Sequence, residues 1–371
     1  MRLSIGIVGL PNAGKSTLFN ALTGAGALAA SYPFATIDPN TGIVPIPDPR
    51  LPELAGLFGS PKHTPAAVTF VDIAGLVRGA SRGEGLGNRF LANIRDVDAV
   101  CHVVRAFAAP GVAHVDDEPG PARDMEAVEA ELVAADLETI DRRLAKLDKE
   151  ATADPGLRRT ADLLHELREV AAAGKPIAEH PALTSGRDEP AKDLAGRRAD
   201  HDDLRLLTAK PVIYVFNCDE EALADPDRRA ELAELTAPAS TLFLNAQIEA
   251  ELMELEAQER AELLESVGQG ESGLDAVIRA AYVALGLQSF LTGNEQETRA
   301  WTIRAGSTAP EAAGEIHTDF QRGFIAAEVI DYDLLIDAGS WGAARARGLI
   351  RTEGKGYVMQ PDDVVLFRFN V

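Results

Sequence analysis

The chain has 371 residues, of which 46% are hydrophobic, and its formal net charge is −22 at pH 7. This length allows two or three compact units with substantial cores. The acidic balance argues against a protein that coats nucleic acid non-specifically, because affinity for phosphate needs clustered Lys and Arg. A local basic patch still permits an RNA partner. No apolar run reaches the roughly 18 residues of a membrane-spanning helix, and no signal peptide is evident. We therefore expect a cytoplasmic protein without membrane contact.

Short apolar runs predict five strands in the first two thirds of the chain. A helix is predicted over residues 16–23, directly after the first strand and a Gly-rich turn. Apolar runs separated by helical stretches are typical of a mainly parallel sheet with crossover helices, an α/β fold. Open sheets of this kind bind ligands at the carboxyl ends of their strands. The predicted strands are residues 3–8, 67–72, 98–104, 211–217 and 240–245.

Residues 123–205 interrupt this alternation of strands and helices. Apolar residues recur at helical spacing from Met125 to Leu147 and again from Leu163 to Val170, on either side of Asp154-Pro155-Gly156. A segment of about 80 residues is too long for an ordinary crossover helix. We predict an inserted antiparallel helical hairpin, followed by a polar loop over 180–203.

Aromatic and β-branched runs return near residue 287, separated by Gly and Pro turns. This change of pattern predicts a separate, strand-rich α+β domain. The predicted division is a main α/β domain formed by 1–122 and 206–286, a helical insertion over 123–205 and a C-terminal domain over 287–371.

Residues 9–16, GLPNAGKS, match the phosphate-binding pattern G-x-x-x-x-G-K-[S/T]. The match lies between a predicted strand and a predicted helix, where backbone N–H groups can surround the α- and β-phosphates of a nucleotide. Lys15 is the candidate to bind the β- and γ-phosphates and to act in catalysis, and the Ser16 hydroxyl is the candidate Mg²⁺ ligand. The other nucleotide contacts predicted in this loop are Asn12, Ala13, Gly14 and Thr17.

The second predicted strand ends in Asp72-Ile73-Ala74-Gly75. A carboxylate at this place supports the Mg²⁺ shell in P-loop enzymes, and the Gly75 N–H can contact the γ-phosphate. Taken alone, the pattern also fits an aspartate in a turn. Its position after an apolar strand and a phosphate-binding loop favours Asp72 as a metal ligand.

Asn217-Cys218-Asp219-Glu220 follows the fourth predicted strand. P-loop GTPases carry Asn-Lys-x-Asp at this place to bind guanine, and here Cys218 and Glu220 replace the Lys and the Asp. A longer Glu does not fit the two hydrogen bonds that a short Asp accepts from guanine, so guanine specificity is in doubt. A simple turn after a strand is the alternative explanation of this tetrapeptide.

With these motifs in place, the chain resembles the YchF family, the Obg-like ATPases of the TRAFAC class of P-loop proteins. The resemblance covers nearly the whole chain and includes GLPNAGKST, YPFATIDPNTGIVPIPD, DIAGLVRGASRGEGLGNRFLANIRD and RAWTIRAGSTAPEAAGEIHTDFQRGFI. It implies a G domain with a coiled-coil insertion and a C-terminal β-grasp TGS domain. In this chain, Gly and Pro interrupt the second helix of the insertion.

The resemblance also implies roles for individual residues. Thr36 would be the second protein ligand to Mg²⁺. Asn217 and Glu220 match a base motif, N-x-x-E, that is associated with acceptance of ATP alongside or above GTP. Asn245 and Ala246 lie where the last base-contacting loop falls, although many relatives have Ser or Cys in place of Asn245.

Leu76 stands where many relatives of Ras carry the Gln that orients the attacking water. Leucine has no donor or acceptor, so another group or a partner must assist hydrolysis. The candidate is His114, because the family carries a histidine in this context and an imidazole suits proton transfer near neutral pH. A solvent-exposed loop histidine is the alternative.

Asn12 occupies a P-loop position at which similar proteins recruit K⁺ to neutralise charge between the β- and γ-phosphates. An asparagine that only stabilises the loop explains the residue equally well. The sequence therefore predicts Mg²⁺ as a cofactor and leaves K⁺ open.

The predicted function is a Mg²⁺-dependent ATPase, with GTP as a possible second substrate, that switches between nucleotide states. The resemblance implies a partner at the ribosome or ribosomal RNA. A non-catalytic, nucleotide-gated binding module and a guanine-specific GTPase are the alternatives. Candidate basic residues for the RNA contact are Arg78, Arg82, Arg89, Arg95, Arg345, Arg347, Arg351 and Lys355, although scattered solvated arginines explain them as well.

Overall fold

The computed structural model describes residues 3–24, 40–73, 86–108, 120–184, 204–266 and 271–370. They form two compact units: the first comprises the described parts of 1–25, 34–42 and 70–274, and the second those of 43–69 and 275–371. In the described ranges, no helix combines the length and the apolar character that a membrane crossing requires.

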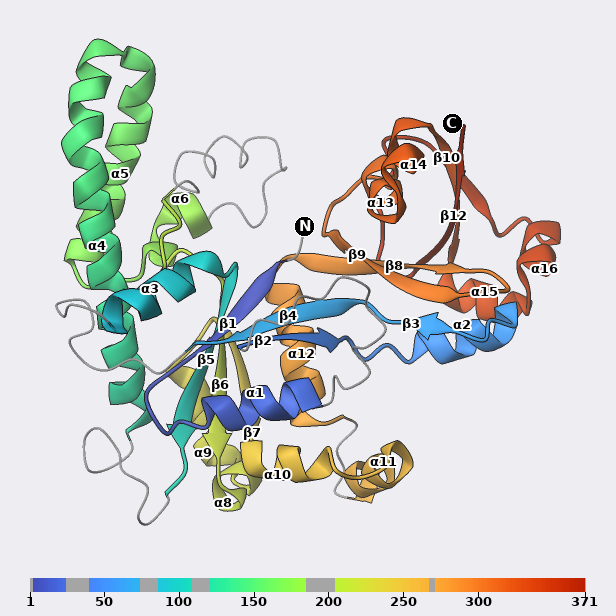
Figure 1. The fold of residues 1–371 in the computed structure, drawn as a ribbon, viewed down its shortest axis with the longest axis horizontal. Coiled ribbons are helices and arrows are strands. Elements are labelled where there is room, and N and C mark those ends of the chain that lie inside the picture. The colour runs from blue at the N-terminus through green and yellow to red at the C-terminus, as the bar shows by residue number, and fades with distance from the viewer. Residues whose placement is uncertain are drawn as a thin grey trace. The chain divides into compact units, whose positions relative to one another are not determined.

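The first sheet has the strand order β2-β4-β1-β5-β6-β7 (Figure 1). The pairs β1–β5, β5–β6 and β6–β7 are parallel, which confirms the predicted α/β class. β2 was not predicted, because its sequence TGIVP offers one short apolar pair between Gly and Pro. The strands are β1 (Ser4–Val8), β2 (Thr41–Pro45), β4 (Ala67–Asp72), β5 (Ala99–Ala106), β6 (Val212–Cys218) and β7 (Ser240–Leu244).

The central strands of this sheet are buried by helices. On one face, Val8 and Val100 pack with Phe90 and Ile94 of α3 and with Val128 of α4. This burial explains why β1 and β5 read as continuous apolar runs instead of alternating ones. Further helices of the first unit are α1 (Lys15–Gly24), α3 (Leu86–Asp96), α8 (Glu220–Ala224), α9 (Pro226–Glu234), α10 (Ala246–Leu252) and α11 (Ala257–Ser266), and α12 (Gly273–Ala284) begins at the end of the first unit and lies mostly in the second.

The insertion is a pair of helices that lie side by side (Figure 1). It consists of α4 (Pro121–Ala153), a 3₁₀ turn η2 (Pro155–Leu157) and α5 (Arg158–Ala172). The predicted break is confirmed: Asp154 ends α4, and its side chain accepts a hydrogen bond from the Gly156 N–H at 2.9 Å. The pair is held by a shared core of α4 and α5 residues that includes Ile140, Leu144, Leu147, Leu164 and Leu167.

The prediction of a loop over 180–203 is wrong for its first residues. A 3₁₀ turn η3 (Ile177–Glu179) leads directly into a short helix, α6 (Pro181–Thr184). Proline at the first position of a helix is favourable, because its missing N–H would have no intrahelical partner there. Residues 185–203 lie outside the described residues.

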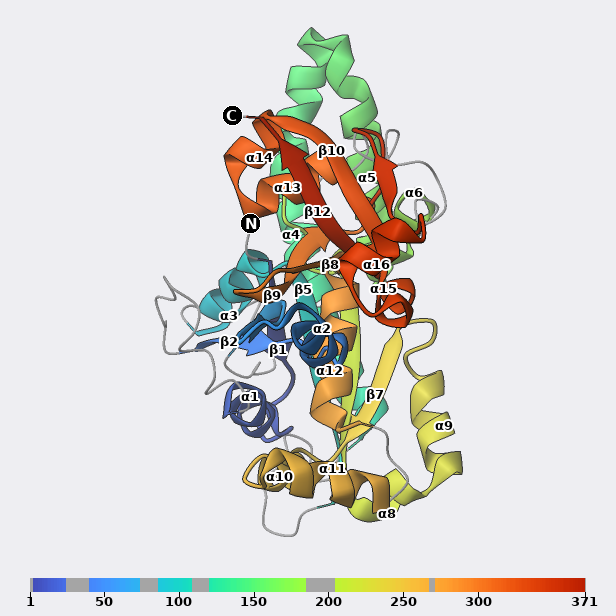
Figure 2. The ribbon, with the colours of Figure 1, turned by 90° about the vertical axis from the view of Figure 1, so that its right-hand side faces the viewer.

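The second unit contains a sheet with the order β11-β10-β12-β8-β9-β3. The pairs β10–β12 and β8–β9 are antiparallel and β12–β8 is parallel, and Figure 2 shows β10 beside β12. Its core joins Phe290, Val365 and Phe367 to Ala309 and Ala313 of α13. The elements are α2 (Arg50–Phe58), β3 (His63–Thr64), β8 (Leu287–Gly293), β9 (Thr298–Arg304), α13 (Ala309–Ile316), α14 (Thr318–Arg322), β10 (Phe324–Asp331), α15 (Tyr332–Ala338), α16 (Trp341–Ala346), β11 (Arg351–Glu353) and β12 (Asp363–Phe369).

Candidate nucleotide-binding site

The phosphate-binding loop connects β1 to α1 in the first unit. Gly9 has φ +147°, and a Cβ atom at this residue would lie 2.3 Å from the Val103 carbonyl oxygen. Asn12 has φ +62°, a left-handed conformation that Asn tolerates better than most residues. The loop therefore needs Gly9 for its close approach to β5, and its backbone geometry alone gives a structural reason for Asn12.

Lys15 is 7% exposed, although it is the first residue of α1. Its Nζ donates a hydrogen bond to the Leu10 carbonyl at 2.8 Å, across the loop. Burial lowers the pKa of Lys15, and the nearby carboxylate of Asp72 opposes this effect. An ammonium group held inside the loop in this way is placed to neutralise phosphate charge.

Ser16 and Asp72 come together although 56 residues separate them in the sequence. The Ser16 hydroxyl donates to Asp72 Oδ2 at 3.2 Å. The other carboxylate oxygen, Oδ1, is buried and has no hydrogen-bond partner among the described residues. Hydroxyl and carboxylate oxygens are the donors that Mg²⁺ prefers, and Mg²⁺ sites commonly use few protein ligands. The pair therefore fits the predicted metal, while Thr36 and Gly75 lie outside the described residues.

Asn217 links the phosphate-binding loop to the first residue of α10. Its Nδ2 donates to the Ala13 carbonyl at 3.0 Å, and its Oδ1 accepts from the Ala246 N–H at 3.0 Å. Gly14 has φ +98°, and a Cβ there would lie 2.2 Å from Asn217 Nδ2. The sequence predicted a base contact for Asn217, and this structural bridge between Ala13 and Ala246 was missed.

The two remaining predicted base contacts begin or precede short helices. Glu220 is exposed and is the first residue of α8. Asn245 caps α10, because its Oδ1 accepts from the N–H groups of Gln247 at 3.0 Å and Ile248 at 3.1 Å. Asn is among the most favourable capping residues, so the cap explains Asn at 245. Thr17 is half-buried in the first turn of α1.

His102 is a buried residue near this site that the sequence analysis did not single out. It lies on β5 with its ring centroid 5.5 Å from that of Tyr214. Burial, aided by the positive charge of Lys15, lowers the pKa of His102 to about 4. The imidazole is therefore neutral at physiological pH.

We expect His102 to make the protein sensitive to acid. Its folded pKa lies below the ordinary value of about 6.5, so between pH 6.5 and 4 the unfolded chain binds more protons, and stability falls as pH falls. His102→Leu should reduce the loss of unfolding free energy between pH 7 and pH 5 by about 2 kcal/mol. Urea unfolding at both pH values measures the unfolding free energies. An equal loss in His102→Leu and in the wild type would contradict the lowered pKa of His102.

The predicted basic residues are only partly described, since Arg78 and Arg82 lie outside the described residues. In α3, Arg89 is exposed and Arg95 is half-buried. In the second unit, acidic neighbours compensate part of the basic charge: Arg345 pairs with Glu328 at 2.5 Å, and Arg351 lies 3.4 Å from Asp363. His114 also lies outside the described residues, so its role stays a prediction.

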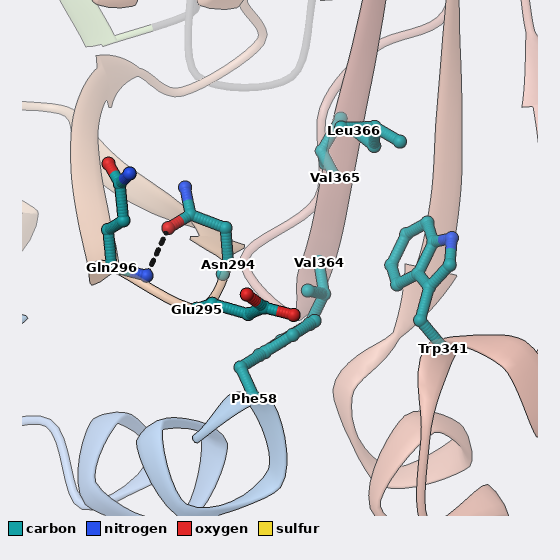
Figure 3. A pocket seen from close by; sticks show the side chains of 9 residues that line it. Phe58, Asn294, Glu295, Gln296, Trp341, Val364, Val365 and Leu366 are labelled. Carbon is teal, nitrogen blue, oxygen red and sulfur yellow. Dashed lines mark hydrogen bonds between the residues drawn. The ribbon is translucent and has the colours of Figure 1, made fainter. Parts of the chain in front are cut away.

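A pocket of about 580 Å³ lies in the second unit, apart from the residues predicted to bind nucleotide. Figure 3 shows Phe58, Val364 and Trp341 around it, with Asn294 and Gln296 near its edge. The pocket is largely apolar and contains none of the phosphate-binding residues. The described candidate site for nucleotide is therefore the group around Lys15, Ser16, Asp72 and Asn217.

The chain is similar to known proteins over its whole length. Residues 4–152 match a family model described as a 50S ribosome-binding GTPase, and residues 287–370 match the model YchF-GTPase_C, described as a protein of unknown function. The proteins called "Ribosome-binding ATPase YchF" of Bacillus subtilis and Escherichia coli are 46% and 44% identical, over 100% of this chain and 100% of each relative.

Solved structures give the same assignment. The structure of the Schizosaccharomyces pombe YchF GTPase has a TM-score of 0.85 and 34% identity, and the match covers 99% of this chain and 98% of that one. A GTP binding protein from Pyrococcus horikoshii, 21% identical over 99% of this chain and 100% of its own with a TM-score of 0.58, shares the fold. The chain belongs to the YchF family of P-loop proteins.

Proposed function

We propose that this protein is a Mg²⁺-dependent ATPase of the cytoplasm that binds ribosomes and changes its contacts with its nucleotide state. The observation that carries the catalytic part is the meeting of Ser16 with Asp72, whose buried Oδ1 has no partner among the described residues. The names of the relatives support ATP as the substrate and the ribosome as the partner.

In this proposal each residue has a physical task. Lys15 neutralises charge on the β- and γ-phosphates, and Ser16, Asp72 and Thr36 hold Mg²⁺. When bound, Mg²⁺ supplies charge stabilisation to the transferring phosphoryl group. The reaction is attack of water on the γ-phosphate, accelerated by positioning and by fixed charges.

Selection of the base rests on the exposed Glu220 and on the segment of Asn245 and Ala246. Asn217 supports the contact with the base and the contact with the phosphates, because it holds Ala246 to the phosphate-binding loop. Gly75 contacts the γ-phosphate, which makes the segment after Asp72 the natural switch.

Steady-state phosphate release tests the catalytic proposal. We expect multiple turnovers of ATP with Mg²⁺ and none when EDTA removes the metal. Co-sedimentation of the protein with purified ribosomes, in ATP and in ADP, tests the partner and its dependence on nucleotide. Absence of turnover with tight ATP binding would favour a non-catalytic switch, for which Leu76 in place of Gln is the supporting observation.

His114→Ala is expected to lower ATP turnover at least tenfold while leaving ATP affinity unchanged, because general acid–base or water-positioning groups contribute about 10²–10⁴-fold to rate. Phosphate release and calorimetry on the same preparations measure the two quantities. Unchanged turnover would remove His114 from the mechanism.

ATP turnover measured in KCl and in NaCl at equal ionic strength decides whether Asn12 recruits K⁺ or only stabilises the loop. Faster turnover in KCl would support a K⁺ ion near the β- and γ-phosphates. Equal rates would leave only the structural role that its left-handed backbone indicates.

A further inference from the structure

Four basic side chains surround a second pocket in the first unit, between α3 and the helical hairpin. The pocket has a volume of about 310 Å³, which is at the lower end of the range of small-ligand sites. Such a concentration of positive charge is unexpected on a chain with a net charge of −22. The lining residues are Arg95, Thr139, Arg142, Arg143, Lys146 and Leu204.

The floor of this basic pocket is held in place by packing and hydrogen bonds. Arg95 Nη2 donates to Thr139 Oγ1 at 2.8 Å, and Thr139 Oγ1 donates to the Ala135 carbonyl at 2.9 Å. Lys210 Nζ donates to the carbonyls of Ile94 at 2.7 Å and Arg95 at 2.8 Å, at the end of α3. Because Arg95 is already ordered, its share in binding an anion costs little conformational entropy.

The positive charge of the basic pocket is not cancelled by its acidic neighbours. Arg142 pairs with Glu138 at 2.8 Å, with both side chains more than half exposed, and Arg143 pairs with Glu150 at 3.0 Å. The four lining cations outnumber the two carboxylates that form ion pairs with them, Glu138 and Glu150, and the buried Asp136, which interacts electrostatically with Arg95, is a third carboxylate nearby. Exposed ion pairs of this kind contribute only about 0–1 kcal/mol, so a phosphate can compete for the guanidinium groups.

We propose that the basic pocket binds a backbone phosphate of RNA, and that it forms part of the contact with ribosomal RNA; the source of the RNA rests on the proposed function. Arginine guanidinium groups bind phosphate oxygens in a bidentate manner. Arg142, Lys146 and Lys149 continue from the pocket along α4 at helical spacing and rise about 10 Å along the helix axis. A row of cations over this length suits successive phosphates of one strand.

The test compares two double variants that remove the same charge from the hairpin. Arg142→Gln/Lys146→Gln removes two cations of the basic pocket. Arg158→Gln/Arg159→Gln removes two exposed arginines at the start of α5, outside it. Glutamine is a good helix former, so circular dichroism and ATP affinity should be unchanged in both. The probes are purified ribosomes and protein-free ribosomal RNA extracted from them, titrated between 50 and 200 mM KCl.

We expect the pocket variant to lose at least tenfold in affinity for the protein-free RNA at 100 mM KCl. The slope of log K against log[KCl] should fall by about 1.4, since each lost single-strand phosphate contact contributes about 0.7. The control variant should change neither quantity by a comparable amount.

Equal losses in both variants, or no loss in the pocket variant, would overturn the proposal. A loss on ribosomes without a loss on protein-free RNA would also overturn it, because the partner would then be an acidic protein surface. Failure of the wild-type protein to bind ribosomes contradicts the proposed function instead. Ribosome binding that does not depend on the basic pocket contradicts the phosphate site alone.

Discussion

Lys15→Met is expected to reduce ATP turnover at least a hundredfold and to leave the protein folded. The Nζ group is the buried cation of the phosphate-binding loop, and in the described structure it donates to the Leu10 carbonyl. Loss of one preorganised charge in a phosphoryl-transfer site costs about 10²–10³ in rate, or about 3–4 kcal/mol. Folding should suffer little, because burial already disfavours the charged ammonium and methionine retains the length of the apolar stem.

Phosphate release under saturating ATP measures the rate, and thermal unfolding without nucleotide measures the stability. Lys62→Met is the matched control, because the Lys62 side chain is 56% exposed and pairs with Glu297, at 3.0 Å, in the second unit. Its turnover should equal that of the wild type. Turnover of Lys15→Met within threefold of the wild type would show that the chemistry takes place elsewhere.

Asn217→Ala is expected to weaken ATP and GTP binding alike and to lower the unfolding free energy by about 3 kcal/mol. The substitution leaves the Ala13 carbonyl and the Ala246 N–H without their side-chain partner. Each buried backbone group left unsatisfied costs about 1–3 kcal/mol. The phosphate-binding loop and the start of α10 would then lose this side-chain link, so both ends of the nucleotide would be held less well.

Glu220→Ala separates this structural role from selection of the base. Glu220 is exposed, so its loss should leave stability within about 0.5 kcal/mol of the wild type and change the ratio of ATP to GTP affinity. Urea unfolding and calorimetry on both variants give the comparison. A change of nucleotide preference in Asn217→Ala with unchanged stability would show that the amide contacts the base directly.

Local patterns predicted much of the fold and the phosphate site. The continuous apolar runs of β1 and β5 are those of strands buried on both faces, and Asp154 ends α4 at the predicted break. Ser16 was predicted as a Mg²⁺ ligand from the phosphate-binding pattern and Asp72 from its place at the end of a strand, and the structure places Ser16 Oγ 3.2 Å from Asp72 Oδ2. The roles of these residues in catalysis stay predictions.

Interactions over long distances in the sequence could not be predicted in the same way. The side-chain amide of Asn217 forms two hydrogen bonds, to residues 13 and 246, and no local sequence pattern contains these residues together. Asn245 resembled a base contact, yet the Asn245-x-x-Ile248 spacing is equally that of a helix cap. Arg95 and Arg142 belong to separate helices, and only the packing of α3 on α4 brings both into the basic pocket.

Calorimetric titration of the nucleotide-free protein with ATP and then GTP, each with and without Mg²⁺, distinguishes a Mg²⁺-dependent ATPase from a guanine-specific GTPase. We expect ATP to bind more tightly than GTP and removal of Mg²⁺ to weaken ATP binding, because Ser16 and Asp72 are proposed to hold the metal. A clear preference for GTP would contradict the ATPase assignment. Nucleotide affinity independent of Mg²⁺ would contradict the metal site.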